Sequence, residues 1–171
     1  QMDLTVTCII PAWNEAARLP AVLAAVVGHP FVHEVLVVDD GSTDGTAEVA
    51  RACGAQVLTM VPNGGKSAAV AAGLRAAKGK IVLLIDADLQ GLTSLHVTEL
   101  LLPLRTGLAD VSISLRSNAP LPWRMIGLDY ISGERAMFAA TLRPHLEQVA
   151  DLRGFGLEVF LNRLWLRERQ R

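Results

Sequence analysis

This chain of 171 residues contains few aromatic residues and few cysteines, and its net charge is close to zero. Aromatic residues make up 5% of it, whereas hydrophobic residues make up 51%. The formal net charge of −1 gives no overall attraction to nucleic acid, so a nucleic-acid-binding class is excluded. The two cysteines, Cys8 and Cys53, show no pairing pattern, which excludes a disulfide-built fold and predicts core thiols in a reducing compartment.

Long hydrophobic runs are absent as well. No run approaches the roughly 18 residues that a membrane-spanning helix requires, and no secretory signal opens the chain. We therefore expect a cytoplasmic globular protein with one domain over residues 1–171 and a core large enough to fold alone. A membrane anchor outside this sequence is left open, as is the oligomeric state.

Strand-like and helical patterns alternate through the first half of the chain. Strands are expected over five stretches, Thr5–Pro11, Val35–Asp39, Gln56–Met60, Ile81–Ile85 and Asp110–Ser114. A helix is expected after each of the first four, with N-caps at Asn14 and Asp44 for the first two and the range Ser94–Leu102 for the fourth. This order predicts an α/β fold with a Rossmann-like, mainly parallel sheet flanked by helices.

The second half of the chain is less regular. Residues 116–130 are rich in proline, glycine and asparagine and are expected to form a long loop of the kind that is often functional. A final helix is indicated by four apolar residues at helical spacing, Leu157, Phe160, Leu161 and Leu164. That helix could dock on the domain, or it could lie against an anionic membrane surface on the cytoplasmic face.

The stretch Ile81–Gln90 is the most informative one, because five apolar residues are followed by polar residues at alternate positions. In an extended backbone, residues two apart share a face, so Asp86, Asp88 and Gln90 are expected to point toward one site past the strand. Open α/β sheets bind ligands at the carboxyl ends of their strands, and oxygen ligands suit Mg²⁺ or Mn²⁺. The alternative is a turn with solvated acids.

Polar residues also follow the first two predicted strands. Trp13 and Glu15 come at the end of the first strand, where they could stack on a base and hold a sugar hydroxyl. Asp39 and Asp40 end the second strand, where a carboxylate could accept a hydrogen bond from a base or a ribose. Helix capping and a buried tryptophan are the structural alternatives for these residues.

The segment Asn63-Gly64-Gly65-Lys66-Ser67 lies between a predicted strand and a predicted helix, as a phosphate-binding loop does. A P-loop ATPase or kinase is therefore one alternative. However, the P-loop pattern requires glycine where this chain has Met60, and the P-loop normally follows the first strand of its sheet. A phosphate-facing role for Lys66 is expected in either case.

Four motifs in this order resemble those of family-two inverting glycosyltransferases. They are Pro-x-x-Asn-Glu at 11–15, Val-Asp-Asp-Gly-Ser-x-Asp-Gly-Thr at 38–46, Asn-x-Gly-Lys at 63–66 and Asp-x-Asp at 86–88. The resemblance covers about Thr5 to Gln90 and is strongest to the dolichyl-phosphate-mannose synthase and glucosyl-3-phosphoglycerate synthase branch. It implies the A-type glycosyltransferase fold, a UDP- or GDP-sugar donor, and Mg²⁺ or Mn²⁺. Residues 1–90 would bind the donor and the metal, and 91–171 would form the acceptor side.

The resemblance also implies individual roles. Donor-binding residues would be Pro11, Trp13, Glu15, Asp40, Lys66 and Asp86, with Asp40 reading the base. The metal would be held by Asp88, with Asp86 and Gln90 beside it. The arginines that contact acceptor phosphates would be Arg116, Arg124 and Arg135.

The general base is the least defined part of the expected site. Glu158 is the first candidate and Glu134 the second, with Arg135 nearby in sequence. The Glu-Asp pair that often supplies the base in this family is absent, and the usual His-Pro-Pro is replaced at 91–93. These departures favour a phosphate-bearing acceptor such as a polyprenyl phosphate, which needs no base. A non-catalytic or truncated nucleotide-sugar-binding module is the remaining alternative.

Overall fold

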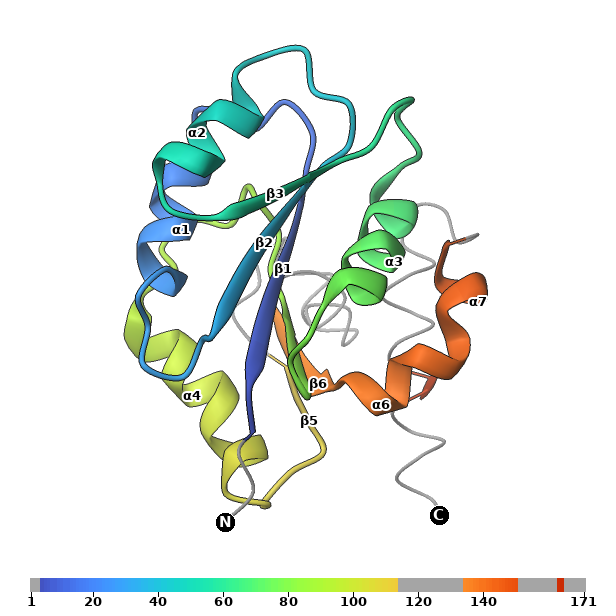
Figure 1. Ribbon diagram of the computed structural model, residues 1–171. Helices are drawn as coiled ribbons and strands as arrows, with labels where there is room; N and C mark the ends of the chain where they lie inside the picture. The colour runs from blue at the N-terminus through green and yellow to red at the C-terminus, as the bar shows by residue number, and fades with distance from the viewer. Residues whose placement is uncertain (1–3, 114–133, 151–162, 165–171) are drawn as a thin grey trace, which may run out of the picture.

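In the computed structural model, residues 4–113, 134–150 and 163–164 are described, and they form one sheet between two layers of helices (Figure 1). The strands follow the order β3-β2-β1-β4-β6-β5 across the sheet. β1 to β4 run parallel, whereas β6 is antiparallel to both of its neighbours. The strands are β1 (Val6–Ala12), β2 (Glu34–Asp39), β3 (Gln56–Thr59), β4 (Ile81–Leu84), β5 (Val111–Ile113) and β6 (Arg135–Phe138). The predicted mainly parallel α/β sheet is confirmed.

Helices cover both faces of this sheet. Figure 1 shows α1, α2 and α4 on one face and α3, α6 and α7 on the other. Their bounds are α1 (Leu19–Val26), α2 (Thr46–Ala52), α3 (Lys66–Ala76), α4 (Ser94–Arg105), α6 (Ala139–Leu142) and α7 (Leu146–Ala150), with a 3₁₀ turn at Arg143–His145. None of the helices among the described residues combines the length and hydrophobicity needed to cross a bilayer.

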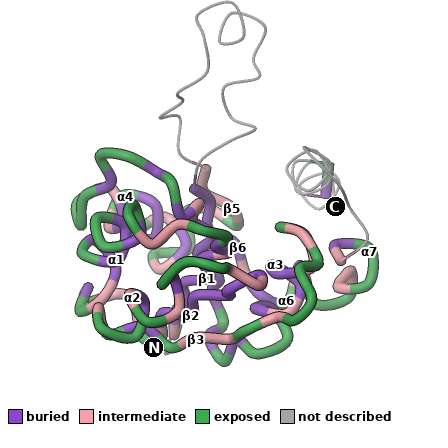
Figure 2. Tube along the Cα trace, turned by 90° about the horizontal axis from the view of Figure 1, so that it is seen from above, coloured by how far each residue is buried: buried purple, intermediate pink, exposed green. Residues whose placement is uncertain are grey.

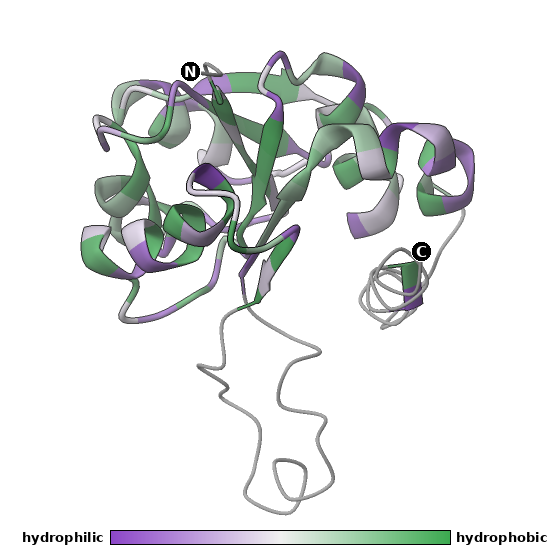
Figure 3. Cartoon of the chain, turned by 90° about the horizontal axis from the view of Figure 1, so that it is seen from below, coloured by the Kyte–Doolittle hydropathy of each residue, from purple (hydrophilic) through white to green (hydrophobic). Residues whose placement is uncertain are grey.

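The alternation of side chains along the strands divides the core in two. Val6, Cys8 and Ile10 of β1 pack with α1 and α4, whereas Ile9 packs with α3 on the opposite face. Figure 2 shows the buried residues gathered between the helical layers, and Figure 3 shows that the central strands are largely hydrophobic. Both cysteines are free, and burial raises the pKa of the Cys8 thiol, so it behaves as a core residue.

Both predicted N-caps were wrong. Asn14 adopts a φ of 53°, and its Oδ1 accepts the Thr43 N–H at 2.8 Å, so it joins two loops while α1 begins only at Leu19. The N-cap of α2 is Gly45, one residue after the predicted position. Asp44 nevertheless accepts the N–H of Thr46 at 3.0 Å, which places a carboxylate at the start of that helix.

Several predictions fall on parts of the chain that the structure does not describe. The loop over residues 116–130 lies outside the described residues, as does most of the final helix. Of that helix, Leu164 is described, and it is buried in the cluster that α3, α6 and α7 share.

At Gly73, α3 packs closely against the sheet. A Cβ at this position would lie 2.6 Å from Cγ2 of Ile9, which is fully buried and β-branched. We expect Gly73→Ala to lower the free energy of unfolding by about 1–2 kcal/mol, because overpacking outweighs a gain in helix propensity of roughly 1 kcal/mol. Urea denaturation measures this. The cost should shrink in an Ile9→Ala background, and a Gly73→Ala protein more stable than its parent would contradict the close packing.

Candidate functional site

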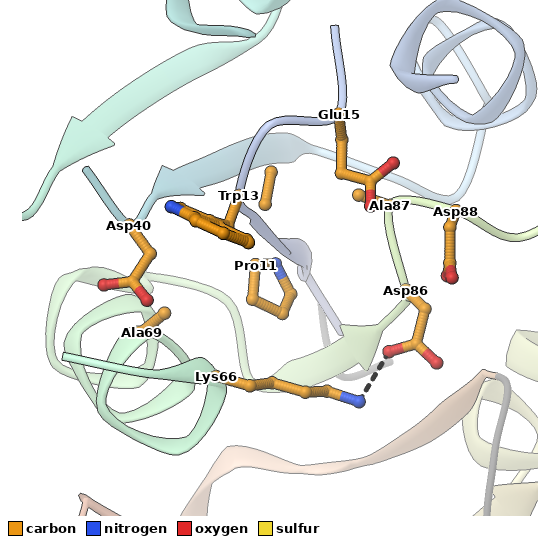
Figure 4. Close-up of a pocket in the computed structure, with 10 residues that line it drawn as sticks. Pro11, Trp13, Glu15, Asp40, Lys66, Ala69, Asp86, Ala87 and Asp88 are labelled. Atoms are coloured by element: carbon orange, nitrogen blue, oxygen red, sulfur yellow. Dashed lines mark ion pairs between the residues drawn. The ribbon is translucent and has the colours of Figure 1, made fainter. Parts of the chain in front are cut away.

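A pocket of about 290 Å³ lies at the carboxyl ends of β1, β2 and β4 (Figure 4). Because β1 pairs in parallel with β2 on one side and β4 on the other, the residues that follow these strands meet at one edge of the sheet. The lining residues are Pro11, Ala12, Trp13, Glu15, Asp40, Lys66, Ala69, Asp86, Ala87 and Asp88. All six residues that were predicted to bind the donor are among them, together with Asp88.

Trp13 provides the aromatic surface of the pocket. Its side chain is exposed, at 56%, which is uncommon for a large hydrophobic residue in the part of the chain that the structure describes. Figure 4 shows its ring over Pro11, on the side of the pocket where Asp40 lies. An exposed indole next to a carboxylate can stack on a base while the carboxylate accepts a hydrogen bond from it.

Asp40 is buried, and its carboxylate is held by backbone amides. Its Oδ1 accepts the Gly64 N–H and its Oδ2 accepts the Gly65 N–H, each at 2.8 Å. In a P-loop, such glycine amides bind phosphate, whereas here they bind a side chain of the neighbouring strand. This arrangement argues against the P-loop ATPase alternative.

Lys66 is the first residue of α3 and crosses the floor of the pocket in Figure 4. Its Nζ lies 2.7 Å from Oδ1 of Asp86, and both side chains are partly exposed. The pocket therefore places an ammonium group next to the acidic residues that follow β4. A cation in this position can offset the charge of a phosphate group that enters the pocket.

An extended backbone was predicted for the acidic segment after β4, and this prediction was wrong. β4 ends at Leu84, and residues 87 and 88 form a turn that the Leu89 N–H closes onto the Asp86 carbonyl. Asp86 and Asp88 still line the same pocket, although not through strand alternation, and Gln90 is exposed outside the lining set. Among the described residues, no three acidic, histidine or cysteine side chains lie close enough together to hold a metal by themselves.

Glu15 faces this acidic segment from the end of β1. Its pKa is raised, chiefly because the carboxylate is desolvated, while Arg18 lowers it and the charges of Asp88 and Asp44 raise it. Asp44 differs, because hydrogen bonds, above all from the Thr46 hydroxyl, lower its pKa. Burial is thus the main influence on Glu15, whereas hydrogen bonding is the main influence on Asp44.

Arg18 is a residue that the sequence did not single out. Its Nη1 lies 3.6 Å from Oε2 of Glu15 and 4.0 Å from Oδ2 of Asp88. It stands three residues after Glu15 in the turn before α1, so helical spacing from Glu15 could have indicated the first contact. Only the fold brings Asp88 next to it.

The residues predicted for the acceptor side are only partly described. Arg116, Arg124 and Glu158 lie outside the described residues. Arg135 is buried in β6, where it pairs with Leu84 of β4, and Glu134 comes immediately before it. Glu134 is 1% exposed, and a general base must reach the acceptor hydroxyl, so this burial argues against Glu134 in that role.

Known proteins resemble this chain over most of its length. The profile of the family described as "Glycosyl transferase family 2" matches residues 7–152. An uncharacterized glycosyltransferase of Mycobacterium tuberculosis is 51% identical over 83 residues, which are 48% of this chain and 36% of that protein. The dolichyl-phosphate beta-glucosyltransferase of Mus musculus is 31% identical over 156 residues, which cover 82% of this chain and 41% of that protein.

Solved structures show the same fold. Glucosyl-3-phosphoglycerate synthase from Mycobacterium tuberculosis, in complex with Mn²⁺, UDP-glucose and phosphoglyceric acid, superposes with a TM-score of 0.76 at 28% identity. The match covers 92% of this chain and 63% of that one, so the chain spans only part of its relatives. The predicted A-type glycosyltransferase fold is thereby confirmed. Since the family profile matches most of its length, the chain belongs to glycosyl transferase family 2.

Proposed function

We propose that the pocket binds a nucleotide-diphosphate sugar together with a divalent cation, and that the chain transfers the sugar with inversion to a phosphate-bearing acceptor. The observation that carries this proposal is the pocket itself, in which an exposed indole, a lysine and four carboxylates meet at one sheet edge. Trp13 would stack on the base, Glu15 and Asp40 would hold the nucleoside, and Lys66 would offset the charge of the diphosphate. UDP-glucose is the first donor to test, because a structural relative was solved with it.

The carboxylates of the pocket fit Mg²⁺ or Mn²⁺. Mg²⁺ is usually held by one or two carboxylates together with substrate phosphates, so a site without three protein ligands suits it. Asp88 would be the principal ligand, with Asp86 and Gln90 as the other candidates, and Mn²⁺ is present in the solved relative. When bound, the cation would help neutralise the nucleotide diphosphate as it leaves.

The class of acceptor depends on whether the site supplies a general base. The names of two relatives include acceptors that carry phosphate, namely dolichyl phosphate and phosphoglyceric acid. The ionised phosphate oxygen of an acceptor such as dolichyl phosphate can attack the anomeric carbon without a general base, which fits the burial of Glu134, whereas attack by a hydroxyl of phosphoglyceric acid would need a base. Arg116, Arg124 and Arg135 stay predictions as phosphate contacts, and Glu158 stays the candidate base for a hydroxyl acceptor. Cytoplasmic location and peripheral contact with a membrane also stay predictions.

A transfer assay tests this proposal against a binding-only role. We expect UDP release from UDP-glucose in the presence of Mn²⁺ and a polyprenyl phosphate or phosphoglycerate, and no release in the presence of a chelator. Tight binding of UDP-glucose without transfer to any phosphate-bearing or hydroxyl acceptor would favour the nucleotide-sugar-binding module instead. The assay is run on this chain and on a longer form with a C-terminal extension, which separates a truncated enzyme from a binding protein.

Arg18 gives a prediction about the cation. Its guanidinium lies near Glu15 and Asp88, so it competes with a divalent cation for the same negative charge. We expect Arg18→Gln to tighten Mn²⁺ binding about 1.4- to fivefold at low salt, as for an exposed ion pair worth about 0.2–1 kcal/mol. Electron paramagnetic resonance of free Mn²⁺, without nucleotide, measures this. Arg51→Gln on α2 is the matched control and should change nothing, while weaker Mn²⁺ binding to Arg18→Gln would contradict the prediction.

A further inference from the structure

One buried carboxylate connects two loops at the edge of the pocket. Asp40 is 4% exposed, and its own N–H donates to the carbonyl of Ala12 at 2.9 Å, which fixes its backbone to β1. Its two carboxylate oxygens accept the N–H groups of Gly64 and Gly65. Hydrogen bonds to an ionised acceptor are stronger than neutral ones, so both the carboxylate and the glycine pair are held in place.

The glycine pair leads directly into α3. Gly65 is the N-cap of this helix, with a φ of 91° and a ψ of 167°, and as a glycine it has no side chain that could cap the helix. The first turn of α3 contains no acidic residue. The carboxylate of Asp40 therefore supplies negative charge and two acceptors at the start of an 11-residue helix, and Oδ1 of Asn63 is a second acceptor for the Gly65 N–H at 3.2 Å.

The rest of the loop before α3 also rests on the end of β2. The Met60 N–H donates to the Asp39 carbonyl at 2.8 Å. A Cβ at Gly41, which has a φ of 77°, would lie 3.3 Å from the backbone nitrogen of Asn63. The two loops therefore approach closely, and the side chain of Asp40 bridges them.

We infer that Asp40 is a positioning residue for Lys66: by holding Gly64 and Gly65 it fixes the start of α3, from which Lys66 reaches into the pocket. Lys66 follows Gly65 directly, and its Nζ lies 2.7 Å from Asp86 across the pocket. This inference rests on the proposed function, in which Lys66 contacts the diphosphate. Asp40 is already expected to contact the nucleotide base directly. The inference gives it a second, indirect role, in which it affects the binding of the diphosphate through Lys66.

The two roles of Asp40 differ in which part of the nucleotide they affect. If Asp40 only contacts the base, its replacement weakens the binding of uridine and of UDP by the same factor. If Asp40 also positions Lys66, its replacement weakens UDP binding more than uridine binding, and this difference disappears when Lys66 is replaced as well. Uridine and UDP are therefore titrated in the presence of Mn²⁺ into the parent chain, Asp40→Asn, Lys66→Met and the double variant, which form a double-mutant cycle.

We expect Asp40→Asn to weaken UDP binding about tenfold more than uridine binding when Lys66 is present, and by equal factors when it is not. Asparagine keeps the size and one acceptor oxygen, and thermal unfolding establishes that each variant is folded before titration. Asp39→Asn is the matched control, since this neighbouring buried acid accepts the N–H of Ser42 at 3.0 Å in the turn before α2 and should show no coupling to Lys66. Equal losses for uridine and UDP with Lys66 present would overturn the inference. A parent chain that binds uridine and UDP equally, or neither, would instead overturn the proposed function, and this is seen before any variant is compared.

Discussion

Replacement of Asp88 by alanine is expected to lower sugar transfer by about 10²- to 10³-fold, the usual cost of losing a group that stabilises charge in the transition state. Asp88 is exposed at the mouth of the pocket, with 58% of its side chain accessible, so its removal leaves no buried group unpaired. The fold should therefore be unaffected, and the loss should reflect the cation alone. Initial rates of UDP release over a range of Mn²⁺ concentrations measure the effect.

The Mn²⁺ dependence identifies the cause of this loss. If Asp88 is a metal ligand, the variant should need more Mn²⁺ for half-maximal rate, and its melting temperature in the absence of metal should match that of the parent. Asp110→Ala is the control, because Asp110 is equally an exposed aspartate but lies before β5 and outside the pocket lining. Full transfer activity in Asp88→Ala would refute the metal role of this residue.

Replacement of Lys66 by methionine is expected to weaken UDP binding by about 10- to 100-fold while leaving uridine binding nearly unchanged. The ammonium would contact the diphosphate, and a charge-assisted hydrogen bond contributes about 1.5–3 kcal/mol. The substitution also leaves Asp86 without the partner that lies 2.7 Å away in the structure. Transfer should fall at least as much as binding, because the charge on the leaving diphosphate is greater in the transition state than in the donor.

Calorimetry with uridine and UDP separates the contribution of the diphosphate from that of the nucleoside. Lys78→Met is the matched control, since Lys78 is exposed beyond the opposite end of α3 and does not line the pocket. A Lys66→Met protein that loses uridine and UDP affinity in equal measure would show that the lysine does not act on the diphosphate.

β1, β2 and β4 could be predicted because they are largely buried on both faces, and such strands form continuous apolar runs. The prediction Thr5–Pro11 became Val6–Ala12, and the helix Ser94–Leu102 became Ser94–Arg105. β6 was missed for an equally physical reason. It has four residues, it starts with a buried arginine, and pairing with β4, more than 50 positions earlier, places it in the sheet.

The gathering of the site residues could also be predicted, since parallel strands bring their carboxyl ends to one edge. Their local geometry could not. Asn14 was expected to cap a helix but accepts the N–H of Thr43, and Asp40 accepts amides 24 and 25 positions away. The turn at Asp88 replaced an expected extension of β4. The contacts of Asn14 and Asp40 join loops that are distant in sequence, which local patterns do not encode, whereas the turn at Asp88 is closed locally by the Leu89 N–H and the Asp86 carbonyl.

The most direct test of this account is a crystal structure of the chain with UDP-glucose and Mn²⁺, collected at a wavelength where manganese scatters anomalously. The account predicts an anomalous peak beside the Asp88 carboxylate, the diphosphate next to Lys66 and the uracil ring against Trp13. A manganese ion bound elsewhere, or a nucleotide outside the pocket formed by the ends of β1, β2 and β4, would contradict it.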